Sequence, residues 1–88
     1  MLFYKMESFR HYASNEEGAV TFTFYKVFTL EGRQLLVIAS DFNSKFQMFH
    51  MQLEDEQWKF MDPEKLPGWI SGFENELHQV IEKNTVFA

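Results

Sequence analysis

The sequence predicts an α+β fold, in which a single-layer, four-stranded antiparallel β-meander carries a C-terminal amphipathic α-helix on one face. Two observations support this prediction. Over residues 18–61, apolar residues tend to alternate with polar ones, which is the period of a β-strand. Over residues 62–84, apolar residues instead recur every three or four positions, which is the period of a helix. A chain of 88 residues is long enough for one hydrophobic core, so we assign residues 1–88 to a single domain.

The N-terminal segment, residues 1–17, is compatible with two predictions. Leu2, Met6 and Phe9 fall at helical spacing. A strand in the same place would mix apolar and polar residues on both of its faces. We therefore favour a helix and keep a strand as the alternative. In either form, the segment is expected to lie against an edge or against the second face of the sheet.

The first predicted strand lies in the stretch AVTFTFYKVFTL at residues 19–30. Its even positions Val20, Phe22 and Phe24 are apolar and alternate with threonines, so one face of this strand should lie in the core. The alternation breaks at Tyr25–Lys26. Either the second half of the strand has apolar residues on both faces, or a β-bulge at this point shifts the register by one residue.

Three further strands are expected, separated by short polar turns. The turn LEGRQ contains Gly32, which reaches positive φ without steric cost and favours a hairpin between the first two strands. The segments DFNSK and EDEQ are the next two turns by composition. The second, third and fourth strands are then LLVIAS at 35–40, FQMFHMQL at 46–53 and WKFM at 58–61.

The C-terminal helix is expected to run from Pro67 to Lys83. Asp62 and Pro63 are suited to cap and start one short turn before it. The apolar stripe of the helix comprises Leu66, Trp69, Ile70, Phe73, Leu77, Val80 and Ile81. This stripe should pack on one face of the sheet.

The stretch LLVIAS raises the question of what covers the second face of the sheet. Leu35 and Val37 should point to one face. Leu36 and Ile38 should then point to the other. Since one helix covers one face, an apolar patch should remain on the second face, and such a patch usually marks an interaction site. The candidate interface comprises Leu36, Ile38, Phe49 and Met51.

This patch has three conceivable covers, namely the N-terminal segment, a second copy of the chain, or a ligand or partner protein. Covering the patch with the N-terminal segment requires no second molecule. A segment of its length, however, shields only part of a four-stranded face. We therefore expect a second copy to close the remainder in a homodimer, because symmetric dimers are the commonest oligomers.

Composition argues against several other classes of protein. The net charge of −5 disfavours nucleic acid as a partner, because its phosphates are bound mainly by lysine and arginine. The absence of cysteine removes thiolate chemistry, and no apolar run approaches the roughly 18–20 residues of a membrane span. We expect a soluble cytoplasmic protein that binds neither nucleic acid nor a membrane.

No catalytic, metal-binding or cofactor-binding site is expected, and therefore no enzymatic activity. The histidines at 11, 50 and 78 fall in different predicted elements, and none stands at a recognised metal-ligand spacing from a second ligand. The serines lack the GxSxG motif of a nucleophile, and the glycines form no phosphate-binding loop. The acidic run at 54–56 lacks the pattern of a calcium loop, so we interpret it as a solvated turn.

The sequence therefore favours a small non-catalytic protein-interaction or adaptor module that forms a homodimer. The alternative is a small apolar-ligand-binding or enzyme accessory domain with a cavity between sheet and helix. In that alternative, His50, Tyr25 and Trp58 are the candidate polar groups of the cavity.

Overall fold

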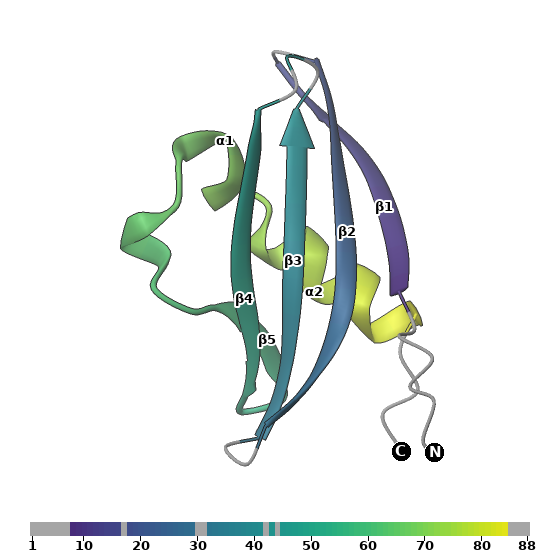
Figure 1. Ribbon diagram of the computed structural model, residues 1–88, viewed down its shortest axis with the longest axis vertical. Helices are drawn as coiled ribbons and strands as arrows, with labels where there is room; N and C mark the ends of the chain where they lie inside the picture. Colours follow the sequence, from purple (N-terminus) through teal and green to yellow (C-terminus); the bar gives the residue numbers. More distant parts are fainter. Residues whose placement is uncertain (1–7, 17, 30–31, 42, 44, 85–88) are drawn as a thin grey trace, which may run out of the picture.

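Five antiparallel strands form one curled sheet, and the C-terminal helices lie on one of its faces (Figure 1). The computed structural model describes residues 8–16, 18–29, 32–41, 43 and 45–84. The strands are β1 (Ser8–Asn15), β2 (Gly18–Thr29), β3 (Gly32–Asp41), β4 (Phe46–Glu54) and β5 (Gln57–Phe60). A 3-10 helix, η1 (Pro63–Lys65), and the α-helices α1 (Gly68–Ser71) and α2 (Glu74–Asn84) follow them.

The strands lie in the sheet in their order along the chain, and each pairs antiparallel with the next. The predicted α+β class and antiparallel meander are therefore confirmed, but the sheet has five strands where four were predicted. The additional strand is β1. The helix favoured for the N-terminal segment is wrong over Ser8–Asn15, which pairs with β2. Residues 1–7 of that segment lie outside the described residues.

β1 is a strand because its alternate residues fit the helix-covered side of the sheet. Phe9 stacks on Phe24 of β2 with ring centroids 4.6 Å apart. His11 Nε2 lies 2.6 Å from Glu76 Oε2 of α2, a partner 65 positions away in the chain. A histidine at an inward position breaks the apolar alternation that would mark a strand in the sequence. Long-range pairing thus overrides the helical spacing of the segment.

The β2–β3 ladder continues without interruption over Val20–Thr29 and Gly32–Asp41. It contains no bulge, so the two-sided strand is the correct one of the two predictions for β2. Lys26 stands opposite Leu35, which is fully buried on the helix-covered side. The alternation breaks at Tyr25–Lys26 because a polar residue, Lys26, stands at a position of the regular ladder where an apolar residue would be expected.

Acidic residues build two of the turns. Asp55 and Glu56 join β4 to β5 with φ angles of 49° and 68°, the left-handed values of a two-residue hairpin turn, and both are exposed. Asp41 closes the turn before β4. Its Oδ1 accepts hydrogen bonds from the backbone N–H groups of Asn43 and Lys45, both at 2.9 Å. Both turns agree with the prediction from composition.

The C-terminal segment is helical but not continuous. The predicted short turn is η1, which Pro63 begins as expected. Asp62 precedes it with φ at 52°, but its side chain makes no cap hydrogen bond. The single helix predicted from Pro67 to Lys83 is interrupted at Gly72, which lies between α1 and α2. Glycine has a low helix propensity, which favours an interruption at this position.

One hydrophobic core fills the space between the sheet and the helices. Its buried apolar residues are Val20, Phe22, Phe24, Leu35, Val37, Ala39, Phe49, Met51, Trp58, Phe60, Ile70, Leu77 and Ile81. The predicted helix stripe is confirmed, since Ile70, Leu77 and Ile81 are fully buried and its other four members pack against the core. Among the described residues, no helix has the length and apolar character needed to cross a membrane.

Side chains of α2 cover the outer edge of β5. The backbone N–H of Trp58 donates to Nδ1 of His78 at 3.0 Å, and that of Phe60 donates to Oε2 of Glu74 at 2.9 Å. Because Nδ1 of His78 is an acceptor, the ring proton lies on Nε2, which is 3.2 Å from Oε1 of Glu82. Two edge donors that would otherwise attract a foreign strand are thus satisfied within the chain.

Candidate functional site

The face of the sheet opposite the helices is the candidate functional site. On β1 to β4 its residues form three rows that run across the strands. The rows are Tyr12–Thr21–Ser40–Phe46, Arg10–Thr23–Ile38–Met48 and Ser8–Tyr25–Leu36–His50. We call these twelve residues the open face. The residues that alternate with them along β2 and β3, such as Phe22 and Val37, are buried beneath the helices.

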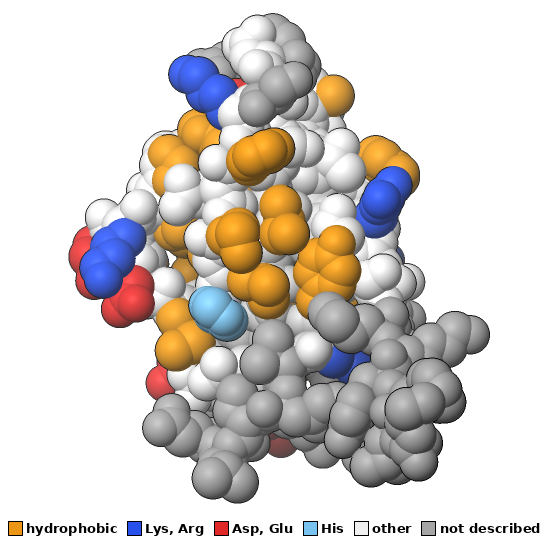
Figure 2. Space-filling model, viewed as in Figure 1, with side chains coloured by type: hydrophobic (Ala, Val, Ile, Leu, Met, Phe, Trp, Pro, Cys, Tyr) orange, Lys and Arg blue, Asp and Glu red, His pale blue; other side chains and the backbone are white. Residues whose placement is uncertain are grey.

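Several large apolar side chains of the open face are in contact with solvent. Tyr12, Phe46 and Met48 are exposed to 70%, 71% and 59%. Leu36 and Ile38, on β3, are half-buried. Figure 2 shows hydrophobic side chains gathered over the middle of this face. The surface is suited to binding through apolar contacts.

The open face differs in charge from the rest of the protein. The chain has 13 acidic and 8 basic residues, yet none of the twelve open-face residues is Asp or Glu. Arg10 on β1 and the exposed His50 on β4 lie at its two sides. Described carboxylates such as Asp55 and Glu82 lie in turns and on the helices instead.

The predicted interface residues do not share one face. Leu36 and Ile38 lie on the open face, as predicted, but Phe49 and Met51 point to the helices and are 5% and 0% exposed. Grouping the four residues was therefore wrong. The β3–β4 register places Met48 opposite Ile38, so Met48 and its strand neighbour Phe46 are the open-face residues of β4.

The error has a clear cause in the sequence. β4 carries apolar residues on both of its faces, so alternation alone does not indicate which set faces the helices. Tyr12 was missed for a different reason, because the preferred helical prediction for β1 removed it from the sheet. The signal that identifies Met48 is its cross-strand partner, which follows from the length of the turn after Asp41.

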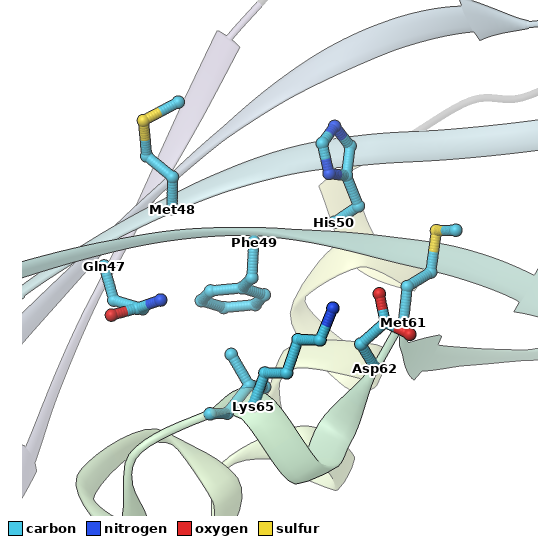
Figure 3. A pocket seen from close by; sticks show the side chains of 8 residues that line it. Gln47, Met48, Phe49, His50, Met61, Asp62 and Lys65 are labelled. Carbon is cyan, nitrogen blue, oxygen red and sulfur yellow. The ribbon is translucent and has the colours of Figure 1, made fainter.

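The three candidate polar groups of a ligand cavity do not converge. Tyr25 and His50 share the open face, with Leu36 between them. Trp58 lies on the helix-covered side, where it is 3% exposed. A hollow with a volume of about 210 Å³ does exist, and His50 is one of the residues that line it. It lies between β4 and η1, at the edge of the sheet (Figure 3).

The described residues offer no metal site. Within them, no group of three or more His, Asp or Glu side chains lies close enough to hold an ion. His11 pairs with Glu76, and His78 accepts from the backbone of Trp58. These two histidines therefore take part in holding α2 against the sheet.

Comparisons with protein-family models, with curated proteins and with solved structures give no match. The functional proposal therefore rests on the fold and on the surfaces of this chain.

Proposed function

We propose that the protein is a non-catalytic interaction or adaptor module whose open face binds a second copy of the chain. The observation that carries this proposal is the exposure of Tyr12, Phe46 and Met48 on one side of a small domain. Monomeric proteins rarely expose contiguous apolar patches larger than a few hundred Å². Covering the patch with a second protein removes this surface from water, which drives association.

The size of the open face suits the centre of a protein interface. Four strands about 4.8 Å apart and three rows about 7 Å apart give the face an area of roughly 400 Å². Interfaces of standard size bury about 800 Å² on each partner, with an apolar centre and a polar rim. The aromatic and methionine side chains of the open face belong to the types enriched in such centres.

The charge distribution favours a second copy as the partner. Two chains that each carry a net charge of −5 repel one another over most of their surface. The repulsion is weakest where the open face is presented, because its three rows contain no carboxylate. In a two-fold dimer the same patch serves both partners, and apolar side chains such as those of Ile38 and Met48 are complementary to their own copies.

Light scattering and sedimentation equilibrium test the proposal. We expect the intact chain to be a dimer at micromolar concentration. Ile38→Glu and Met48→Glu each place two like charges in the middle of the dimer interface, so both variants should be monomeric. Of the two substitutions, Met48→Glu should disturb folding less, since the Met48 side chain is 59% exposed. The control Gln79→Glu adds the same charge to the exposed surface of α2 and should remain dimeric.

An intact chain that stays monomeric up to about 100 μM contradicts the proposal, because its association free energy is then weaker than about 5.5 kcal/mol. The N-terminal segment would then be the remaining predicted cover. Dimers that persist in both glutamate variants would place the interface on another surface. Met51→Glu is unsuitable for this test, since Met51 is fully buried in the core and its replacement would report on folding.

A further inference from the structure

Part of the edge of β4 is open. The edge consists of backbone groups of β4, whereas the open face consists of side chains. β5 pairs with β4 only over Met51–Glu54. The carbonyl of His50 accepts a hydrogen bond from the backbone N–H of Met61 at 3.0 Å, which extends the pairing by one residue. Within the described part of the chain, no strand pairs with this side of β4 over Phe46–Phe49.

The direction of the backbone groups along this edge follows from the His50 hydrogen bond. In an antiparallel sheet, the N–H and C=O groups of one residue point to the same side, and this side alternates along the strand. The carbonyl of His50 points away from β3, so the backbone groups of Met48 and Phe46 point the same way. Two residues of β4 therefore present strand-type donors and acceptors at this edge.

A groove follows the same edge. The hollow of about 210 Å³ is lined on one side by β4 residues 47–50 and on the other by Met61, Asp62, Lys65 and Leu66. Figure 3 shows Gln47 and Phe49 pointing from β4 toward the side where Lys65 reaches up from η1, whereas Met48 and His50 point the opposite way. The side of the groove opposite β4 carries one basic side chain, Lys65, and one acidic side chain, Asp62, so it favours neither sign of charge on a ligand.

The rest of this sheet edge is protected, in contrast to the segment Phe46–Phe49 of β4. On β5, His78 and Glu74 accept the hydrogen bonds of the outward N–H groups of Trp58 and Phe60. In the described residues, no side chain plays this part for Met48 or Phe46. Natural proteins usually cover or charge their edge strands, because an open edge pairs with other chains.

We propose that this groove binds an extended peptide segment of a partner protein, which adds to β4 as a further strand. The outward backbone groups of Met48 and Phe46 require a partner with its own backbone donors and acceptors. The volume of about 210 Å³ is below the roughly 300–1,000 Å³ of small-molecule pockets. η1 stands across the groove from β4, so the strand that adds to β4 would also contact Lys65 and Leu66. An apolar, β-branched side chain of the peptide would rest against Phe49 and Leu66.

The test uses the acetylated and amidated pentapeptide Thr-Val-Thr-Val-Thr, an uncharged probe with high strand propensity. Added at millimolar concentration to the isotope-labelled intact chain, it should shift the backbone amide resonances of Phe46 and Met48. It should also slow the hydrogen exchange of these two amides by about tenfold or more. Two versions, N-methylated at the valines or at the threonines, keep every side chain. The version methylated on the side that faces β4 should bind about tenfold more weakly.

A matched pair of protein variants tests the same edge. Met48→Ala and Met48→Pro both remove the side chain, but only proline removes the outward N–H, and an edge position tolerates proline. Met48→Pro should bind the probe about tenfold more weakly than Met48→Ala. The N-methylated peptides keep the test decisive should Met48→Pro not fold.

Three results would overturn the proposal. The first is the absence of any change at the two amides with millimolar probe, and the second is equal binding of the probe and both methylated versions. The third concerns the Ile38→Glu variant without peptide. If exchange of these two amides becomes slower as the concentration of this variant increases, the edge binds a second copy. That variant lacks the proposed open-face contact, so this outcome is independent of the dimer proposed above.

Discussion

Replacing Phe22 with alanine is expected to lower the free energy of unfolding by about 3–5 kcal/mol, the range for deleting a buried phenylalanine ring. Phe22 is 0% exposed. Its ring meets the ring of Phe73, which precedes α2, edge to face with centroids 5.1 Å apart. Alanine leaves a cavity between the sheet and the helices. Since small domains are stable by only about 5–15 kcal/mol, urea denaturation should show a large shift in midpoint.

Phe46→Ala is the matched control, because it makes the same substitution on the other face of the sheet. Phe46 is 71% exposed, so its loss should change the free energy of unfolding by less than about 1 kcal/mol. The comparison requires a low protein concentration, because a dimer formed through the open face would otherwise add to the stability. Equal losses in the two variants would mean that the helices do not pack on the face that carries Phe22.

The sequence predicts an element well where a local period corresponds to a buried face. In LLVIAS, Leu35 and Val37 are fully buried, whereas Leu36 and Ile38 are half-buried on the opposite face. The interior of the C-terminal helix follows the predicted stripe in the same way. These predictions succeed because the side-chain directions of a strand or a helix depend only on its own backbone geometry.

The parts that were missed depend on residues far apart in the chain. β1 is a strand because it pairs with β2 and because His11 meets Glu76, and neither partner is visible in a local pattern. The open face of β4 depends on register, which places Met48 opposite Ile38. The groove along the edge of β4 depends on where β5 stops pairing and on the position of η1, so no sequence motif predicts it.

The edge of β5 is the second place where a large loss of stability is expected. There His78 and Glu74 accept the backbone hydrogen bonds of Trp58 and Phe60 from positions one helical turn apart on α2. Four residues along a helix span nearly the same length as two residues along a strand, so the two acceptors lie beside the two donors. The bond to Glu74 has a carboxylate oxygen as acceptor, and such charge-assisted bonds are stronger than neutral ones.

The double variant Glu74→Ala/His78→Ala should lower the free energy of unfolding by about 2–6 kcal/mol, because removing the acceptor of a part-buried donor costs about 1–3 kcal/mol. Alanine has the highest helix propensity, but the two substitutions also remove the Glu74 charge from the first turn of α2 and the contact between His78 and Glu82. The control variant must therefore lack the same two features. The control Glu74→Gln/His78→Gln places an amide oxygen acceptor at both positions, in place of the Glu74 carboxylate oxygen and the His78 ring nitrogen, and should retain most of the stability. Hydrogen exchange at the amides of Trp58 and Phe60 should accelerate only in the alanine variant. If the alanine and glutamine variants unfold at the same urea concentration, the two hydrogen bonds do not hold α2 against β5.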